Sequence, residues 1–171
     1  MGKKSTKENK NIYHISRENA GLTRERAADV LGFISADRFE KIENRNFITQ
    51  PDEILAMADG YKNPSLFNYY CSQICPIGQE YVPKVTAKDL SVITLEMLST
   101  LNTLVREKDR LIDIAADGEI SEDEIPDFIK IQSELDRMSL TIDSLKLWVD
   151  NTIASGKIDR SLLKKQETQG Q

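Results

Sequence analysis

Hydrophobic positions recur at helical spacing along most of the chain, and the strict alternation typical of strands is nearly absent. N-capping residues, glycines and prolines divide the first third of the chain into short segments. The predicted helices cover residues 11–20, 23–31, 35–44 and 51–60, with another from 63 onward. The pattern therefore predicts an all-α fold that begins with a compact five-helix domain over residues 11–75.

Two longer apolar stripes follow one another in the second half of the chain. The first consists of Leu90, Ile93, Met97, Leu101, Leu104 and Leu111, widened by Leu98, Val105 and Ile112. The second forms a heptad seam of Phe128, Ile131, Leu135, Met138, Ile142, Leu145 and Val149. Capping boxes at Thr86 and Ser121 mark the two starts, and the Asp117-Gly118 pair breaks the pattern between them. This half predicts a long antiparallel two-helix hairpin over residues 87–157.

Both stripes are wider than the interior of a two-helix hairpin. Either the hairpin folds back on the first domain, or two copies of the chain form a four-helix bundle. The bundle is favoured, so we expect a homodimer.

The remaining segments carry few helix signals. Residues 1–10 predict a flexible basic arm and residues 158–171 a flexible tail. Residues 76–86 contain Pro76, Gly78 and Pro83, which are typical of a linker between the two domains.

Composition and charge narrow the functional classes. With 39% hydrophobic and 30% charged residues, the chain is typical of globular proteins, and no apolar run approaches the ~20 residues of a spanning helix. Two cysteines are too few for a disulfide framework, which favours a reducing cytoplasmic location. The net charge of −5 is uneven, because residues 1–60 are balanced and residues 87–171 carry −6. A nucleic-acid surface would therefore lie in the first half.

The helices predicted at residues 23–31 and 35–44 have the features of a helix-turn-helix. Ala27 and Ala28 are small enough for a close crossing, Gly32 allows the turn, and Phe39 with Ile42 gives the second helix an inward apolar face. A helical hairpin that never contacts DNA satisfies the same requirements.

Residues 12–70 resemble the phage-repressor-like (XRE or Cro type) helix-turn-helix family. The motifs that carry the resemblance are Ser16-Arg17-Glu18, Ala20-Gly21-Leu22-Thr23, the segment from Ala28 to Gly32, and Lys41-Ile42-Glu43-Asn44. The resemblance implies double-stranded DNA as the partner and a repressor-like five-helix domain. It also implies that Glu43 faces inward and pairs with Arg17.

The same resemblance assigns the DNA-binding residues. It places base-reading positions at Ser35, Ala36, Asp37 and Lys41, and it places Arg24 near a phosphate. Lys41 can donate to guanine and Ala36 can contact a thymine methyl group, whereas Asp37 either accepts from cytosine or repels phosphate. Arg38 and Arg45 are candidates for backbone contacts, to which the basic arm adds non-specific attraction.

Cys71 and Cys75 are four residues apart and share one face if that segment is helical. A tetrahedral metal site needs four ligands, and His14 is distant in the sequence, so only a site shared across a dimer would complete the set. A redox-sensing disulfide is a second possibility, and two small buried residues are the third and favoured one. We find no catalytic arrangement and expect neither an enzyme nor a cofactor.

These features together predict a sequence-specific DNA-binding transcriptional regulator that acts as a dimer on a palindromic site. Its half-sites would be about one helical turn, or ~34 Å, apart. Two alternatives stay open: a protein–protein interaction module that has the fold without binding DNA, and a cysteine-based metal or redox sensor.

Overall fold

The computed structural model describes residues 10–44 and 47–159, and every regular element in these ranges is a helix. The expected all-α fold is therefore confirmed. The chain divides into two compact units. Among the described residues, the first unit consists of 10–44, 47–84 and 149–159, and the second of 85–148.

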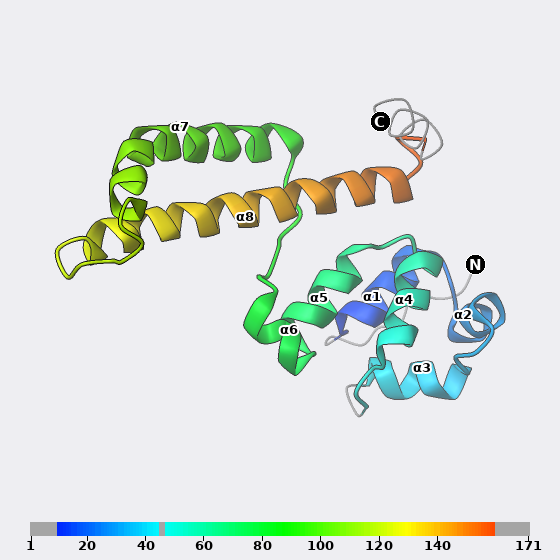
Figure 1. Ribbon diagram of the computed structural model, residues 1–171. Helices are drawn as coiled ribbons and strands as arrows, with labels where there is room; N and C mark the ends of the chain where they lie inside the picture. The colour runs from blue at the N-terminus through cyan, green and yellow to red at the C-terminus, as the bar shows by residue number, and fades with distance from the viewer. Residues whose placement is uncertain (1–9, 45–46, 160–171) are drawn as a thin grey trace, which may run out of the picture. The chain divides into compact units, whose positions relative to one another are not determined.

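Six short helices form the body of the first unit (Figure 1). They are α1 (Ile12–Asn19), α2 (Arg24–Leu31), α3 (Ala36–Glu43), α4 (Pro51–Gly60), α5 (Ser65–Gln73) and α6 (Pro76–Tyr81). A side-chain cap precedes each of the first three, because Asn11, Thr23 and Ser35 accept hydrogen bonds from backbone N–H groups of the first turn. These local signals explain why the predicted helix starts lie close to the observed ones.

The core of this unit is built from one apolar face of each of its first five helices. Its buried members are Tyr13, Ala27, Ile34, Phe39, Ile42, Ile54, Met57, Ala58, Tyr61 and Leu66. Phe39 and Ile42 are each 1% exposed, as their spacing of three along α3 predicts. Because both side chains point inward, the opposite side of α3 faces outward.

The segment expected to be a linker, residues 76–86, is helical over its first half, where α6 lies. Pro76 occupies the first turn of α6, a position at which proline favours a helix. Gly78 is buried, and a Cβ atom on it would lie 2.2 Å from the carbonyl oxygen of Cys71. Proline and glycine therefore start α6 and bring it close to α5, so that the linker interpretation was wrong for residues 76–81.

The second unit contains α7 (Leu90–Ala115) and most of α8 (Ile125–Ala154), which run in opposite directions and are joined by a turn (Figure 1). The first of these helices begins after the N-cap Asp89 rather than at Thr86. Two ion pairs join the helices, Lys130 with Glu107 and Arg110 with Asp127, each at 2.6 Å. The predicted hairpin is present, but its unit ends at residue 148 rather than 157.

The buried line between α7 and α8 differs from the predicted seam. Ile93, Thr100 and Ile114 are buried on α7, and Ile131, Thr141, Ser144 and Leu147 on α8. Leu135 and Ile142, which the heptad pattern placed inside, are 48% and 40% exposed. The hydroxyl groups of Thr100, Thr141 and Ser144 donate to carbonyls one turn earlier in their own helices, which lets these polar residues be buried.

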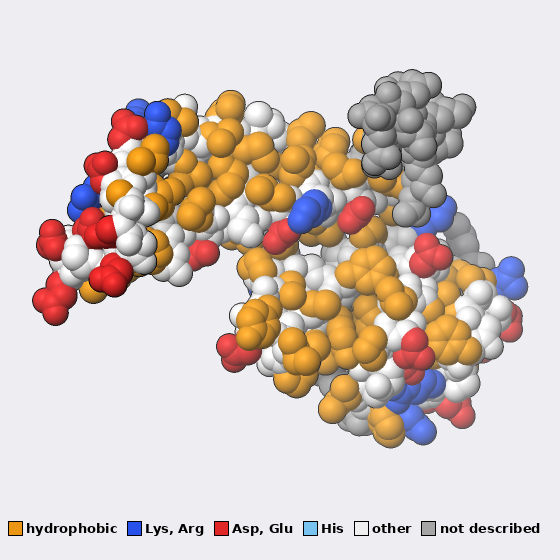
Figure 2. Space-filling view, in the orientation of Figure 1, with side chains coloured by type: hydrophobic (Ala, Val, Ile, Leu, Met, Phe, Trp, Pro, Cys, Tyr) orange, Lys and Arg blue, Asp and Glu red, His pale blue; other side chains and the backbone are white. Residues whose placement is uncertain are grey.

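Large hydrophobic side chains consequently remain at the surface of the second unit. On α7 they include Leu98, Leu101, Val105 and Ile112, which share one helical face and are between 44% and 68% exposed. Figure 2 shows hydrophobic side chains gathered over α7 and α8, with acidic ones where the two helices join. The acidic residues of that turn are Asp117, Glu119, Glu122, Asp123 and Glu124.

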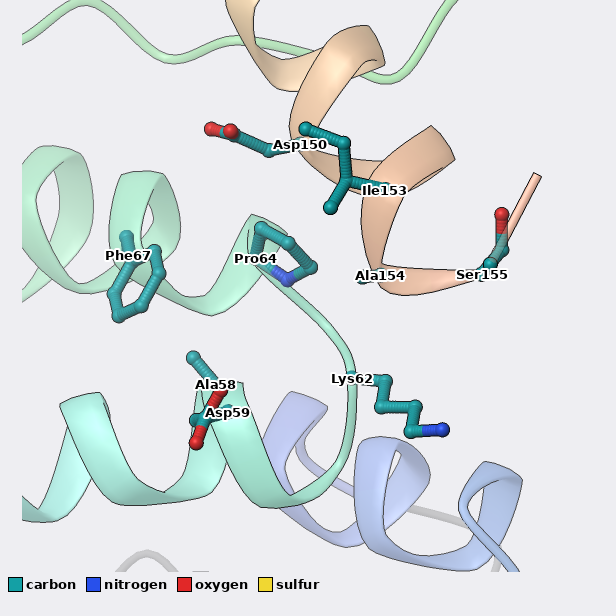
Figure 3. Close-up of a pocket in the computed structure, with 10 residues that line it drawn as sticks. Ala58, Asp59, Lys62, Pro64, Phe67, Asp150, Ile153, Ala154 and Ser155 are labelled. Carbon is teal, nitrogen blue, oxygen red and sulfur yellow. The ribbon is translucent and has the colours of Figure 1, made fainter. Parts of the chain in front are cut away.

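The end of α8 belongs to the first unit, where it lines a cavity of about 590 Å³ together with α4 and α5. Phe67, Pro64 and Ile153 contribute apolar surface, and Asp59 and Asp150 contribute carboxylates (Figure 3). The hairpin predicted over residues 87–157 thus contributes to both units.

The close approach at Gly78 generates a test of the packing of α6. We expect Gly78→Ala to displace α6 from α5 and to cost about 1–3 kcal/mol, because the added methyl group meets backbone atoms that cannot move aside. Gly60→Ala is the control, since its methyl group meets the end of the Leu31 side chain. Hydrogen exchange of the amides in residues 77–82 and thermal unfolding measure the effect; equal behaviour of the two variants would contradict it.

Candidate nucleic-acid interface

The outward side of α3 presents the residues predicted to read DNA. Ser35, Asp37 and Lys41 are exposed, and Ala36 is half-buried. The hydroxyl group of Ser35 accepts a hydrogen bond of 3.2 Å from the backbone N–H of Arg38, so this residue also caps the helix. The structure therefore brings four of the predicted DNA-binding residues to one exposed stretch of the chain.

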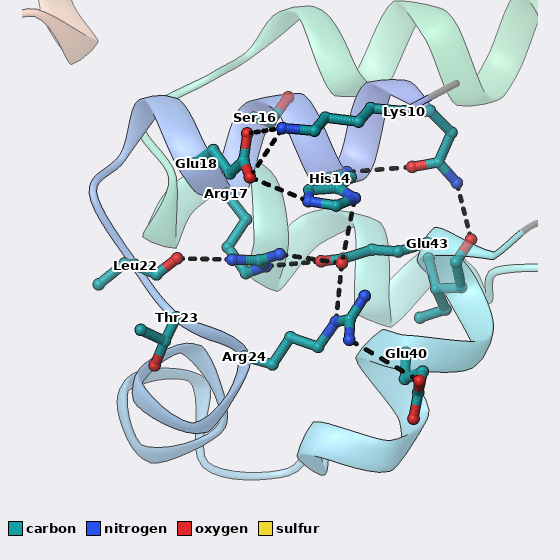
Figure 4. Close-up of polar contacts among 12 residues, drawn as sticks. Lys10, His14, Ser16, Arg17, Glu18, Leu22, Thr23, Arg24, Glu40 and Glu43 are labelled. Carbon is teal, nitrogen blue, oxygen red and sulfur yellow. Dashed lines mark hydrogen bonds and ion pairs between the residues drawn. The ribbon is translucent and has the colours of Figure 1, made fainter. Parts of the chain in front are cut away.

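The ion pair between Arg17 and Glu43 is present and buried (Figure 4). Arg17 donates from Nε and Nη2 to the two carboxylate oxygens of Glu43 at 2.6 and 2.9 Å. Its Nη1 donates to the backbone carbonyl of Leu22 at 2.6 Å. This bidentate arrangement ties α1 to the C-terminal end of α3 and to the segment that precedes α2.

Arg24 also contacts the carboxylate of Glu43. Its Nε donates to Oε2 of Glu43 at 2.9 Å, and its Nη1 lies 3.8 Å from Oε1 of Glu40. The predicted phosphate-binding residue is thus oriented by two acidic residues of α3.

Further polar residues in α1 and directly before it extend this network. The Nε2 atom of His14 lies 3.1 Å from Glu18, and its Nδ1 atom lies 3.6 Å from Glu43. Lys10 donates to Glu18 at 2.7 Å. The amide of Asn11 donates to the carbonyl oxygen of Ile42 at 2.7 Å. His14 and Asn11 contact the last turn of α3 directly, so the helix is held at that end.

Arg38 is paired with an acidic residue of the first unit. Its guanidinium makes a bidentate ion pair with Glu53 near the start of α4, with an Nη2–Oε2 distance of 2.7 Å. The same Nη2 donates to the carbonyl oxygen of Ile48 at 3.0 Å. Arg38 therefore holds the loop between α3 and α4, and its contact with a DNA phosphate stays a prediction.

Phe47 is a surface residue that the sequence analysis missed. Its ring is 54% exposed, and its centroid lies 5.5 Å from Nζ of Lys41 and 5.0 Å from Cζ of Arg38. These distances fit cation–π contacts, which orient Lys41 without burying its charge. The sequence signal that could have pointed to Phe47 is its place as an aromatic residue in the polar loop after the predicted reading helix. Arg45, the remaining predicted contact, lies outside the described residues.

Electrostatics explain how two acidic residues remain charged inside the unit. Burial by itself would raise the pKa of Glu43, but hydrogen bonds from Arg17 and Arg24 outweigh it, so the pKa lies below its ordinary value. Burial would also raise the pKa of Glu53. Hydrogen bonds from Arg38 and from the Gln50 backbone outweigh that effect, so the pKa of Glu53 is lowered as well. Both carboxylates are therefore anions at neutral pH.

The two cysteines lie at the junction of α5 and α6. Cys71 belongs to α5 and Cys75 precedes the first residue of α6, and both are half-buried free thiols. Among the residues that the structure describes, no group of three or more His, Cys, Asp or Glu side chains is placed to hold a metal ion. No helix within residues 10–44 or 47–159 combines the length and the apolar character needed to cross a membrane.

Comparison with known proteins gives no relative for this arrangement: no family model, no curated protein and no solved structure matches the chain.

Because Arg17 and Arg24 share the carboxylate of Glu43, we expect Glu43→Gln to lower the stability of the fold strongly and in a pH-dependent way. The substitution leaves Arg17 and Arg24 without their anion, and we expect the free energy of unfolding to fall by about 3–5 kcal/mol at neutral pH. Because the folded pKa of Glu43 is lowered, its contribution is present above the ordinary pKa of about 4.3 and is lost as the pH falls through the folded value.

The difference between wild type and Glu43→Gln should therefore shrink below about pH 4. Urea unfolding between pH 3 and 7 measures it. Glu80→Gln is the control, because Glu80 is exposed on the surface of α6. A cost below 1 kcal/mol at pH 7 would show that Glu43 does not hold the helices together.

Proposed function

We propose that the protein is a sequence-specific DNA-binding regulator and that α3 docks in the major groove. One observation carries this proposal: the outer face of α3 is exposed while its last turn is locked to α1 and α2 through Glu43. A reading helix must present side chains to base edges from a rigid position, and this arrangement provides that. Lys41, oriented by Phe47, is the side chain best placed to donate to guanine.

Charge limits what one copy can achieve. Arg24 and Arg38 are both paired with carboxylates inside the unit, so few cations remain to attract phosphate. Two copies on a palindromic site would add their contacts. The exposed face of α7 supports such a dimer, because a monomer rarely exposes so many large hydrophobic side chains on one helical face.

A second function, the interaction module, is also favoured by a specific observation. Large apolar side chains flank α3 on the chain, with Val30 and Phe33 before it and Phe47 and Ile48 after it, all more than half exposed. Such residues suit a protein partner better than a phosphate backbone. The salt dependence of binding separates the two functions, because affinity for DNA falls steeply as the salt concentration rises, whereas apolar docking does not weaken in this way.

Selection of bound fragments from random genomic DNA should yield an enriched palindromic sequence. On that duplex, we expect Lys41→Gln to cost about 1–3 kcal/mol of binding free energy. Lys84→Gln is the matched control, since it removes the same charge from an exposed position outside α3. Equal losses in the two variants would exclude Lys41 as a base contact. No enrichment at low salt would favour the interaction module.

The dimer is tested by the mass of the protein in solution. The chain has a mass of 19.4 kDa, and we expect sedimentation equilibrium of the wild type to give twice that mass. The double variant Leu98→Ser, Leu101→Ser removes two exposed apolar contacts and should shift the equilibrium to the monomer. Asn102→Ser on the same helix is the control. A monomeric wild type at high concentration would contradict the proposed bundle.

A further inference from the structure

We propose that Glu40 gates Arg24: its carboxylate occupies the outer end of the guanidinium group until a DNA phosphate takes its place. This inference rests on the proposed function, because the phosphate belongs to a duplex bound at α3. It assigns to Glu40 a regulatory role in affinity, although an acidic residue on a reading helix would ordinarily only repel DNA.

The geometry distinguishes the two ends of the guanidinium (Figure 4). At the inner end, Nε donates to the carboxylate of Glu43, whose side chain is 1% exposed. At the outer end, Nη1 lies 3.8 Å from Glu40, whose side chain is 58% exposed. Arg24 itself is 28% exposed, so its guanidinium spans the boundary between the polar network and the solvent.

The strengths of the two contacts differ for a physical reason. A separation of 3.8 Å exceeds hydrogen-bond distance, and exposed ion pairs of this kind contribute little because water screens them. The bond to Glu43 is short, charge-assisted and buried. The outer contact can therefore exchange while the inner one keeps the guanidinium oriented.

A phosphate is a suitable replacement for Glu40. The guanidinium plane presents its N–H donors in a fixed fork that matches phosphate oxygens as well as carboxylate oxygens. Glu40 lies on α3 beside the exposed Lys41, so a duplex docked there would bring its backbone toward Glu40. Rotation of the exposed Glu40 side chain would remove a repulsive charge and release the outer donors of Arg24 in one step.

Asp37 provides a matched control. It carries the same charge on the same helix, three residues before Glu40, and it is also exposed. Within the described residues, the ion pairs of Arg24 are with Glu40 and Glu43. On a duplex of mixed sequence, where Asp37 reads no specific base, removing its charge measures general repulsion, whereas removing that of Glu40 measures repulsion plus the release of Arg24.

The experiment titrates a fluorescent mixed-sequence duplex of about 20 base pairs with the full chain at several salt concentrations. We expect Glu40→Gln to raise the affinity about fivefold at low salt. We also expect it to steepen the slope of log K against log salt by about 0.9, which corresponds to one additional phosphate contact. Asp37→Asn should give a smaller gain and an unchanged slope.

A double-mutant cycle completes the test. In the Arg24→Gln background, Glu40→Gln should gain no more than Asp37→Asn does, because no guanidinium remains to be released. Arg17 keeps its bidentate bond to Glu43 in this background, and a melting curve checks that the protein is folded. If Arg24→Gln does not fold, the salt slopes of the two single variants decide.

Two outcomes overturn the gate alone. One is equal gains and equal slopes for Glu40→Gln and Asp37→Asn, and the other is a gain for Glu40→Gln in the Arg24→Gln background that is still larger than the gain for Asp37→Asn. A folded wild type that binds no duplex even at low salt, together with variants that bind none, overturns the proposed function and the gate with it.

Discussion

The arrangement of the first unit depends on one buried anion, the carboxylate of Glu43, whose side chain is 1% exposed. Removing a charge from water costs several kcal/mol unless partners replace the lost hydration. Glu43 is also the last residue of α3, where the helix dipole disfavours a negative charge. Arg17 and Arg24 offset both costs, and they come from two other helices. A single carboxylate therefore fixes the orientation of α1, α2 and α3 relative to one another.

The same network determines how much charge is left for a ligand. Arg24 and Arg38 are long cations at the start of α2 and within α3, yet each makes its shortest contact with a glutamate. The first holds the end of α3 and the second holds the loop that follows it. The exposed face therefore combines rigid backbone with low positive charge. Such a surface would discriminate between ligands through shape and a few directed donors rather than through net charge.

Much of this fold could be predicted from local signals in the sequence. Thr23 and Ser35 cap the helices expected from them, Phe39 and Ile42 are buried, and the Arg17–Glu43 pair follows from the family resemblance. The pairing of Arg38 with Glu53 could not be predicted, because the chain offers many acids and only the folded position of the start of α4 beside Arg38 selects one. The short helix α6 was missed for a related reason: proline and glycine mark linkers, but they also permit a helix start and close packing, and the sequence alone does not distinguish the two.

The buried hydroxyls between α7 and α8 have a mechanical consequence. Each donates to a carbonyl of its own helix, so these bonds add nothing that fixes one helix against the other. The directional contacts that do cross, Lys130 with Glu107 and Arg110 with Asp127, involve partly exposed charges that mobile ions attenuate. The alignment of the two helices therefore rests mainly on their apolar packing. Added salt would weaken the directional contacts that reinforce this alignment, so the hairpin would be held less firmly at high ionic strength.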